Sequence, residues 1–338
     1  MQMLGLMERF RFLLFPLALF YWGLTLWREF FYRVGFFVSH RLPVPVVSVG
    51  NITMGGSGKT PTVISIAETL LNMGKRPAIV SRGYGRATSG TVVVSDGEGK
   101  VVMWEESGDE PLLMATRLPS TPVVVDEERF RGGMAAVEQF GVDVLILDDA
   151  FQHRAVERDL DIVLINSREP KEHYRMFPYG RLREPTWSVG RSDIIILTKV
   201  DRQITVPSVQ RKISQKAKTM LKSTLRPRGT ERLKGLKVVA FCGIADPDSF
   251  AFTLTQIGAD IVGLEKFRDH YVYNESDLSR LRKLLEKENA DALVTTEKDW
   301  VKLPLSEKER NLIVPVPIDV MWLNEGEACL NEALQKLF

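Results

Sequence analysis

Residues 45–60 join a run of β-branched residues to a glycine-rich segment, and this feature constrains the fold more than any other. The segment reads PVVSVGNITMGGSGKT. Its first half is typical of a buried strand, and residues 61–72 carry apolar or small side chains at helical spacing. Glycine backbone can approach an anion closely, and the N-terminus of the following helix also attracts phosphate. The pattern therefore predicts a strand, a phosphate-binding loop (P-loop) and a helix.

The end of this loop has the residue types that bind a nucleotide with Mg²⁺. Lys59 can reach the terminal phosphates, and the hydroxyl of Thr60 can hold the metal. The general G-x-x-x-x-G-K-[ST] pattern has a glycine where this chain has Thr53. A turn that only joined a strand to a helix would need neither the lysine nor the hydroxyl. The predicted nucleotide contacts are Thr53, Gly55, Gly56, Ser57, Gly58, Lys59, Thr60 and Pro61.

Length and composition set broad limits on the rest of the chain. The 338 residues are enough for two domains with separate cores. The formal net charge of +2 gives no argument for nucleic-acid binding. Two cysteines are too few for a disulfide framework or a metal cluster, which fits a reducing cytosol.

An uncharged apolar run near the N-terminus, FLLFPLALFYWGLTLW, has basic residues on both sides. It is shorter than the roughly 20 residues that cross a bilayer core, and Pro16 and Gly23 weaken a regular helix. The flanking aromatic residues and arginines are typical of a helix at the membrane interface. A signal peptide is disfavoured because no small-residue cleavage site follows, and a core helix is the other alternative. We expect residues 1–36 to form a membrane-associated helix.

Strand-like and helix-like segments alternate along most of the chain. Continuous Val, Ile and Leu runs up to about residue 200 are typical of parallel strands that are covered on both faces. Between residues 202 and 234 large apolar residues become rare, and a second α/β pattern then begins. It includes a predicted helix at 275–288 and strands in ALVTT and LIVPVPIDV. We therefore predict an α/β fold with a parallel-sheet domain at 37–225 and a smaller C-terminal α/β domain at 226–338.

Acidic residues stand at two places where strands or helices are expected to meet a ligand. Asp148 and Asp149 end the strand VDVLILDD, as a Walker B strand does when it presents a carboxylate to Mg²⁺. Neighbouring strand residues point to opposite faces, so the pair would divide its roles unless the chain bends. In SGDEP, Asp109 and Glu110 stand at an expected helix start, where capping is an alternative role.

Arginines and one histidine add further candidates. In SRGYGR, Arg82 and Arg86 could clamp phosphates, and Arg181 and Arg183 in YGRLREP lie near the same expected edge of the sheet. Solvated basic turns are the alternative. His270, in the second α/β segment, could pair with a carboxylate of the first to form a base across a cleft.

The segment LTKVD, residues 197–201, imitates the element with which GTPases select guanine. No D-x-x-G motif follows the two strand-end acids, where the chain reads DDAFQH. These two segments therefore do not decide which nucleotide base the protein selects.

Seven segments, taken in their order along the chain, closely resemble the tetraacyldisaccharide 4′-kinase family, the lipid A 4′-kinases. These segments are SVGNITMGGSGKTP, SRGYGR, SGDEP, LDDAFQH, PYGRLREP, DHYVY and TTEKD. The resemblance reaches about residue 302, and in this family threonine is normal in place of the first loop glycine. It implies a P-loop kinase-like domain and transfer of the γ-phosphate of ATP, with Mg²⁺, to the 4′-hydroxyl of a tetraacyldisaccharide 1-phosphate. It further implies the cytoplasmic face of a Gram-negative inner membrane, with the acylated lipid and the membrane surface as partners. Neither nucleic acid nor an obligate protein partner is expected.

The resemblance also implies residue roles. Asp109, oriented by His270, would take the proton from the sugar hydroxyl. The implied catalytic set is Asp109, His270, Lys59 and Asp149. The implied metal ligands are Thr60, Asp148, Asp149 and Glu110. The implied substrate contacts are Asn51, Arg82, Tyr84, His153, Arg181 and Arg183.

Two positions depart from the family pattern. Ala150 stands where glycine is common, and Tyr271 stands where a second histidine is common, which leaves His270 as the only dyad candidate there.

Two other functions are alternatives to a lipid kinase. The first alternative function is a P-loop GTPase or ATPase switch, or a metallochaperone-type protein, with no lipid acceptor. The second is an anchored ATPase that moves a partner.

Overall fold

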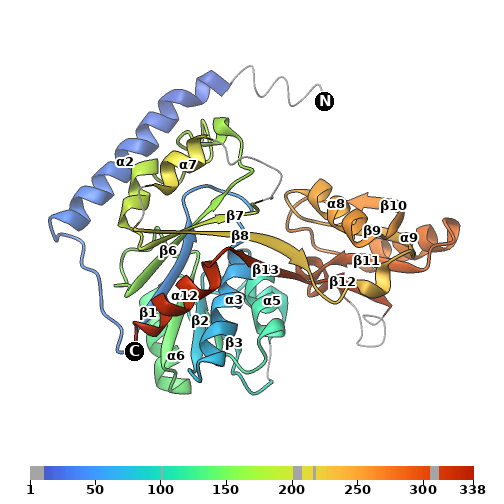
Figure 1. Ribbon diagram of the computed structural model, residues 1–338, viewed down its shortest axis with the longest axis horizontal. Helices are drawn as coiled ribbons and strands as arrows, with labels where there is room; N and C mark the ends of the chain where they lie inside the picture. Colours follow the sequence, from blue (N-terminus) through green and yellow to red (C-terminus); the bar gives the residue numbers. More distant parts are fainter. Residues whose placement is uncertain (1–10, 100–101, 201–207, 216–217, 305–311) are drawn as a thin grey trace.

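The computed structural model describes residues 11–99, 102–200, 208–215, 218–304 and 312–338. Within these ranges the strands form a nine-stranded and a four-stranded sheet (Figure 1). The larger sheet has the order β13-β8-β7-β6-β1-β5-β2-β4-β3, and only its β3–β4 and β8–β13 pairs are antiparallel. Its strands are β1 (Val46–Asn51), β2 (Pro77–Ser81), β3 (Val92–Ser95), β4 (Val123–Val125), β5 (Val144–Asp148), β6 (Leu160–Asn166), β7 (Ile194–Thr198), β8 (Thr219–Pro227) and β13 (Ile318–Leu323). The mixed α/β fold predicted from the sequence is confirmed.

Helices cover both faces of the larger sheet, which explains why its central strands are continuously apolar. On one face lie α3 (Lys59–Asn72), α5 (Asp109–Arg117) and α12 (Gly326–Gln335). On the other lie α6 (Arg129–Phe140), α7 (Ser208–Ser214) and the 3₁₀ helix η3 (Thr186–Arg191). Two short helices, α4 (Trp104–Ser107) and η2 (Lys171–His173), lie in connections. Every residue of β1 and β5 is buried, as expected for central parallel strands.

The smaller sheet is entirely parallel and has the order β10-β9-β11-β12. Its strands are β9 (Lys237–Cys242), β10 (Asp260–Lys266), β11 (Ala292–Thr296) and β12 (Ile313–Val316). The flanking helices are η4 (Glu231–Leu233), α8 (Pro247–Ile257), α9 (Glu275–Lys287) and α10 (Glu297–Trp300). Phe250 and Leu254 of α8 pack on one face, and Leu278 and Leu281 of α9 pack on the other. This unit is therefore a three-layer α/β structure with its own core.

The two sheets do not divide at the boundary expected near residue 225. The strand β8 was missed in the sequence because its residues alternate between buried and exposed and include several polar side chains. LIVPVPIDV, expected to be one strand, forms two, because Pro317 separates β12 of the smaller sheet from β13 of the larger. The C-terminal segment thus returns to the larger sheet, and α12 packs against its core (Figure 1).

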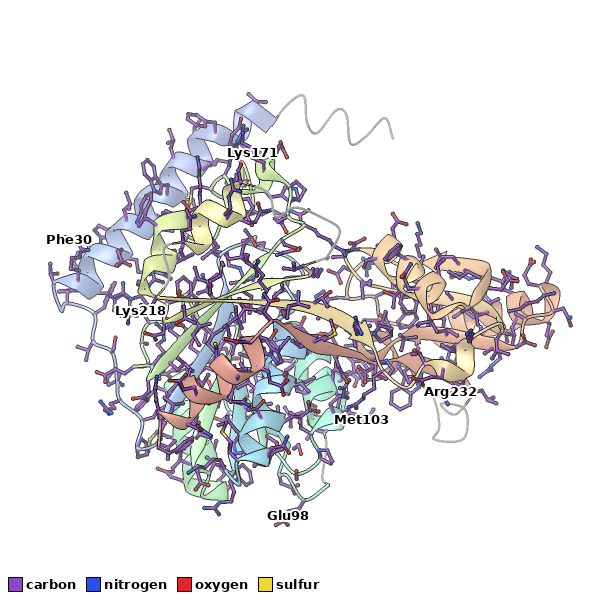
Figure 2. All side chains as sticks on the ribbon, in the orientation of Figure 1. Phe30, Glu98, Met103, Lys171, Lys218 and Arg232 are labelled. Atoms are coloured by element: carbon purple, nitrogen blue, oxygen red, sulfur yellow. The ribbon has the colours of Figure 1, made fainter. Side chains whose placement is uncertain are left out.

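A long N-terminal helix, α2 (Phe15–Arg33), follows a short 3₁₀ turn, η1 (Arg11–Leu14). One side of α2 contacts the loop before η3: the Tyr21 hydroxyl donates to the Arg183 carbonyl at 3.0 Å, and Arg28 pairs with Glu184 at 2.5 Å. The other side is open, and Phe30 projects from the end of the helix (Figure 2). No helix of the described segments has both the length and the apolar character needed to cross a membrane. Residues 1–10 of the predicted anchor lie outside the described residues.

Candidate active site

The glycine loop, residues 51–58, connects β1 to α3 and is fixed by hydrogen bonds within itself. The Asn51 amide nitrogen donates to the Thr53 carbonyl at 2.7 Å and to the Ser57 hydroxyl at 2.9 Å. Thr198, at the end of β7, donates its hydroxyl to the Ser57 carbonyl at 2.8 Å. Gly58 has φ of +85°, a conformation that glycine adopts readily, and α3 begins at the next residue. Lys59 is therefore held at a helix N-terminus directly after the loop.

A second segment runs beside this loop and brings two arginines to it. The Met54 N–H donates to the Arg181 carbonyl, and the Arg183 N–H donates to the Ile52 carbonyl, both at 2.8 Å. The Arg183 guanidinium donates to both carboxylate oxygens of Asp149 at 2.8 Å. The two segments pair through backbone hydrogen bonds, and this pairing explains why the two arginines lie beside the glycine loop.

The two acids at the end of β5 are separated by a bend. Asp149 has φ of +48°, so the regular alternation of strand side chains stops after Asp148. The Asp149 carboxylate lies 3.5 Å from the Lys59 ammonium, whereas Asp148 accepts the Ser81 hydroxyl hydrogen at 2.8 Å. The other oxygen of Asp148, Oδ1, is buried and has no hydrogen-bond partner among the described residues. This orphaned acceptor is well suited to a cation or to a cation's water shell.

The surroundings move the pKa values of the two acids in opposite directions. Burial, followed by the nearby Glu110 and Asp149 carboxylates, raises the pKa of Asp148 to about 7. Burial also acts to raise the pKa of Asp149, but the charges of Lys59 and Arg183 and a hydrogen bond from Arg183 hold it below its ordinary value. Glu110, at the start of α5, is thus one of the carboxylates that act on Asp148.

Asp109, at the start of α5, and His270, in the loop after β10, form a hydrogen-bonded pair. The distance between His270 Nδ1 and Asp109 Oδ2 is 2.8 Å. Burial acts to raise the pKa of Asp109, but the His270 hydrogen bond and the charges of Lys298 and Lys302 leave it below its ordinary value. The hydrogen bond to Asp109 raises the pKa of His270, against burial. Packing of Leu112 of α5 against Val301, just after α10, holds the two units together at this point.

Two lysines that the sequence reasoning did not select lie against this pair. Lys298, in α10, lies 3.2 Å from His270 Nε2 and 3.8 Å from Asp109 Oδ2. Lys302, four residues later, lies 3.6 Å from the same oxygen of Asp109. Lys298 belongs to the segment TTEKD, and its position just after the carboxyl end of a strand is the signal that could have selected it.

The remaining predicted substrate contacts differ in their surroundings. Arg82 and Tyr84 are exposed, and the Tyr84 ring centroid lies 5.5 Å from that of His270. Burial and then the charges of nearby arginines lower the pKa of His153 to about 4, so its imidazole is neutral at pH 7. Asn51 is fully buried and donates its amide hydrogens within the glycine loop, so its contact with substrate stays a prediction.

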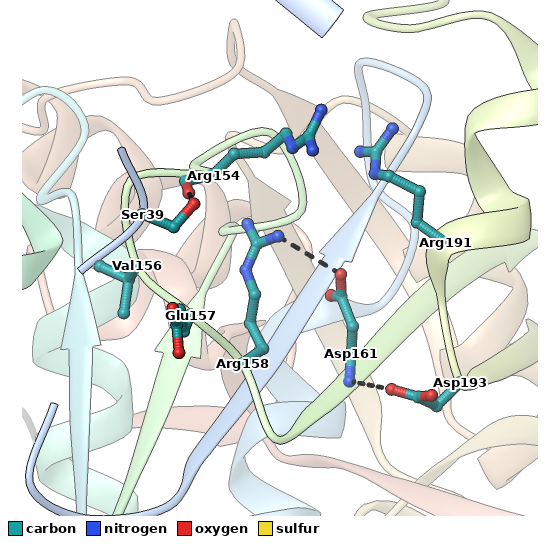
Figure 3. Close-up of a pocket in the computed structure, with 8 residues that line it drawn as sticks. All are labelled: Ser39, Arg154, Val156, Glu157, Arg158, Asp161, Arg191 and Asp193. Carbon is teal, nitrogen blue, oxygen red and sulfur yellow. Dashed lines mark hydrogen bonds and ion pairs between the residues drawn. The ribbon is translucent and has the colours of Figure 1, made fainter. Parts of the chain in front are cut away.

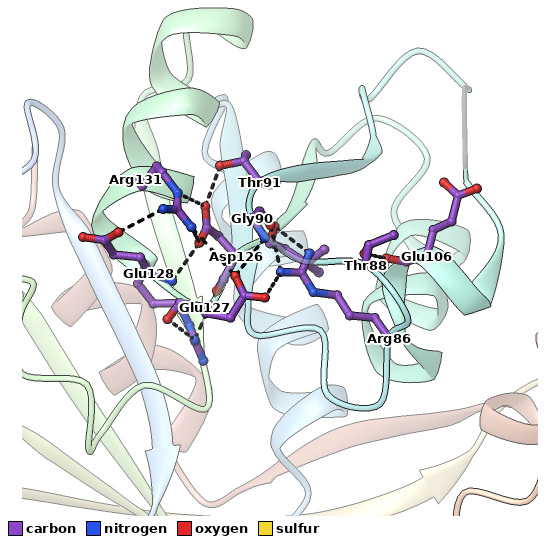
Figure 4. A network of polar contacts seen from close by, with 11 residues as sticks. Arg86, Thr88, Gly90, Thr91, Glu106, Asp126, Glu127, Glu128 and Arg131 are labelled. Atoms are coloured by element: carbon purple, nitrogen blue, oxygen red, sulfur yellow. Dashed lines mark hydrogen bonds and ion pairs between the residues drawn. The ribbon is translucent and has the colours of Figure 1, made fainter.

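Arg86 is not available as a phosphate clamp. Its guanidinium donates to the Glu127 carboxylate at 2.6 Å and to the carbonyls of Gly90 and Val125 (Figure 4). In the same network, Arg131 and Thr91 both donate to Asp126. The arginine therefore ties the loop after β2 to the start of α6, and its expected phosphate contact is not supported.

One cavity is lined by none of these residues. It has a volume of about 220 Å³ and is lined by Ser39, Arg154, Val156, Glu157, Arg158, Asp161, Arg191 and Asp193 (Figure 3). Asp161 and Asp193 lie at the amino ends of β6 and β7, whereas the glycine loop lies at the carboxyl end of β1. Arg158 pairs with Asp161 inside the cavity at 3.6 Å. The cavity contains none of the predicted site residues, so it is not part of the candidate active site.

The fold and the site together define a class of enzymes. A parallel sheet carries, at the carboxyl ends of β1 and β5, a glycine loop, a lysine at a helix start and two acids. This is the arrangement of α/β enzymes that bind a nucleotide and transfer its phosphate.

Comparison with known proteins identifies the family within this class. The model of the family described as Tetraacyldisaccharide-1-P 4′-kinase matches residues 10–338. A protein named Tetraacyldisaccharide 4′-kinase from Chlorobaculum parvum is 40% identical over 306 residues, covering 86% of this chain and 84% of the relative. One of the same name from Chlorobium phaeovibrioides is 38% identical over 344 residues, covering 96% and 97%. The chain belongs to this family, and the kinase function in lipid A biosynthesis predicted from its sequence is confirmed.

A solved structure extends the similarity to the fold. The crystal structure described as the "apo" form of LpxK from Aquifex aeolicus in complex with ATP has a TM-score of 0.79 and 34% sequence identity. The similarity covers 97% of this chain and 99% of that chain. It agrees with the large, mainly parallel sheet described above and supports the predicted use of ATP.

Proposed function

We propose that this chain transfers the γ-phosphate of ATP to the 4′-hydroxyl of a tetraacyldisaccharide 1-phosphate, with Asp109 as the base. The observation that carries the proposal is the contact between Asp109 and His270, because it places a buried carboxylate at the junction of the two sheets. Glu110, the next residue, is close enough to Asp148 to raise its pKa. This influence supports one shared site for Asp109 and the two acids at the end of β5.

The proposed reaction is a direct displacement at phosphorus. Asp109 accepts the proton of the 4′-hydroxyl while the sugar oxygen forms a bond to the γ-phosphorus. The bond from that phosphorus to the oxygen bridging to the β-phosphate breaks, and ADP leaves. Lys59 neutralises charge on the β- and γ-phosphates, and Arg183 holds Asp149 beside that lysine. Phosphoryl transfer depends mainly on such positioning and charge neutralisation.

The residues present also fit a Mg²⁺ ion, which we propose is held with the nucleotide. The orphaned Oδ1 of Asp148 is the observation that supports it. Among the described residues, no group of three or more His, Cys, Asp or Glu side chains could hold a metal by itself. Mg²⁺ is usually bound by one or two carboxylates together with phosphates. Bound metal would neutralise charge on the transferring phosphate, and Thr60, Asp148, Asp149 and Glu110 would hold it.

Asp148→Asn should stabilise the nucleotide-free protein at pH 8. The pKa of Asp148 is raised in the folded state, so the folded protein binds more protons than the unfolded chain between about pH 4 and pH 7. Stability is therefore lost as pH rises through this window, and a neutral asparagine avoids that loss. We expect calorimetry to show a Tm at least about 3 °C higher than wild type at pH 8, with the gain shrinking toward pH 5.

Asp143→Asn is the matched control, because Arg76 lowers the pKa of Asp143 on the surface and its replacement should bring no gain. A lower Tm for Asp148→Asn at both pH values would contradict the electrostatic account of the metal site.

We further propose that α2 lies on the cytoplasmic face of a Gram-negative inner membrane. The side chains of Leu17, Phe20, Leu24, Trp27 and Phe30 recur at helical spacing, and between 47% and 68% of each is exposed. An exposed apolar helix face of this size is typical of a membrane-surface helix. The opposite side contacts the loop that carries Arg183, so a docked helix would bring the site close to a lipid substrate.

The double variant Phe20→Glu with Trp27→Glu should lose most of its binding to vesicles that contain anionic phospholipid. Charged side chains on the apolar face remove the burial that drives interfacial binding. The measurement is the fraction of protein that sediments with the vesicles. Phe252→Glu with Leu312→Glu, two exposed apolar positions outside α2, serves as the control and should sediment like wild type. Equal sedimentation of the α2 variant would contradict the proposal.

The domain organisation that best fits the sheets has two units. We propose that residues 37–227 and 318–338 form the kinase domain and that residues 228–317 form a smaller inserted domain. In this division the phosphate site belongs to the first unit and His270 to the second.

The proposed reaction is tested with ATP labelled at the γ-phosphate and two acceptors. The protein is incubated with Mg²⁺ and either the acylated disaccharide 1-phosphate or the same lipid with its 4′-hydroxyl blocked. We expect label in the first lipid and none in the second. Nucleotide hydrolysis with no label in either lipid would instead favour a nucleotide switch without a lipid acceptor.

A further inference from the structure

Lys298 contacts the Asp109–His270 pair from α10, beside the smaller sheet, and the proposed reaction gives it no role. It follows β11 directly, in the short helix α10. Its ammonium lies 3.7 Å from the Glu110 carboxylate and 3.6 Å from that of Asp269, in addition to its contact with Asp109. Its shortest polar contact, 3.2 Å, is with His270 Nε2. Asp269 Oδ1 also lies near Nε2, at 3.9 Å, so Lys298 is the nearer of the two charged groups at that nitrogen.

The chemistry of the partners fixes the tautomer of His270. An ionised carboxylate only accepts hydrogen bonds, so Nδ1 must carry the hydrogen that points to Asp109. An ammonium only donates, so Nε2 must accept from Lys298 with its lone pair. A hydrogen on Nε2 would face the N–H groups of Lys298 at this distance. The geometry therefore selects the neutral ring with its hydrogen on Nδ1.

Lys302 supports the same carboxylate from a buried position. Only 2% of its side chain is exposed, and its ammonium lies 3.3 Å from Asp299 and 3.6 Å from Asp109. Asp299 is itself held in place, since it accepts the Gly243 N–H at 2.9 Å and the Thr296 hydroxyl hydrogen at 2.7 Å. Lys302 belongs to the framework, whereas Lys298 is the lysine that reaches the imidazole.

We propose that Lys298 is a positioning residue, which holds His270 as the Nδ1–H tautomer so that the imidazole donates to Asp109 and orients it as the base. The inference rests on the proposed function, because it presumes that Asp109 takes the proton. It goes further in giving the smaller sheet two contributions to the reaction, the imidazole and the group that sets its tautomer. Removing the ammonium leaves Nε2 without its donor, so the other tautomer becomes accessible and Asp109 loses its hydrogen bond for part of the time.

The first test observes the tautomer itself. The protein has four histidines, so selective ¹⁵N-histidine labelling gives few ring signals, and His270→Gln assigns those of His270. Wild type at pH 8 without nucleotide should show the hydrogen on Nδ1 of His270. Lys298→Met should show a mixture of the two tautomers. Lys298→Arg retains a donor and should restore the wild-type signals, which also controls for misfolding.

The second test separates kcat from KM. We expect Lys298→Met to lower kcat by about 10- to 100-fold, the cost of a misplaced catalytic group, with the KM for ATP changed by less than about threefold. Lys283→Met, an exposed lysine on α9, is the matched control and should behave like wild type.

Each outcome of the two tests decides one point. Unchanged ring signals in Lys298→Met would overturn the inference, whether kcat falls or not, and so would a changed tautomer with normal kcat. If Asp109→Asn and His270→Gln lose turnover while Lys298→Met keeps it, only the role of Lys298 fails. If Asp109→Asn keeps turnover, the proposed base itself fails.

Discussion

Asp109→Asn is expected to lower kcat by about 10²- to 10⁴-fold, the usual contribution of a general base. The amide keeps the shape of the carboxylate but cannot take the proton of the sugar hydroxyl. The glycine loop and Lys59 lie in separate elements, so the KM for ATP should change by less than about threefold. Steady-state kinetics with the lipid acceptor measures both parameters.

The control for this variant is Asp260→Asn, an exposed acid at the start of β10 that lies outside the site. It should show wild-type kinetics. A kcat for Asp109→Asn close to wild type, or a loss that appears only in KM, would show that the proton leaves by another route.

The second large effect is expected at the glycine loop. Lys59→Met should lower kcat/KM for ATP by about 10²- to 10³-fold, the usual cost of losing one charged donor to the reacting group. Asp149 would lose its contact with Lys59, but the Arg183 contacts at 2.8 Å remain, so the fold should persist. The measurement is the rate of lipid phosphorylation over a range of ATP concentrations, with circular dichroism to check folding.

Lys218→Met is the comparison for Lys59, because Lys218 makes a surface ion pair with Asp193 and lies far along the chain from the loop. Such pairs contribute little to stability, so its kinetics should match wild type. If Lys59→Met kept its kcat/KM, the loop would not be the phosphate site.

The sequence predicted best where the signal is local. Residues 45–72 contain a strand, a turn and a helix start within one segment, so the glycine loop and Lys59 could be placed from spacing alone. Asp109 and His270 are 161 residues apart in sequence, and only the family resemblance predicted that the two would pair. Lys298 was missed for the same reason, since nothing near it in the chain shows that Asp109 lies beside it.

Other differences come from packing that a pattern does not show. The sequence does not show that Asn51 is fully buried or that its amide donates within the glycine loop. Arg86 suggested a phosphate clamp but is neutralised by Glu127, which follows a different strand. The strand β8 alternates in burial because it lies near one edge of the larger sheet, where only β13 lies beyond it.

The most direct test of the central claim, that the glycine loop and the Asp109–His270 pair act on one acceptor, is a structure with all substrates in place. The protein would be crystallised with Mg²⁺, a non-hydrolysable ATP analogue and the acylated disaccharide 1-phosphate. We predict the 4′-oxygen within hydrogen-bond reach of the Asp109 carboxylate, about 2.6–3.2 Å, with the γ-phosphate beside Lys59. The claim would be contradicted if the 4′-oxygen contacted another residue while Asp109 stayed paired to His270 and out of reach of the sugar.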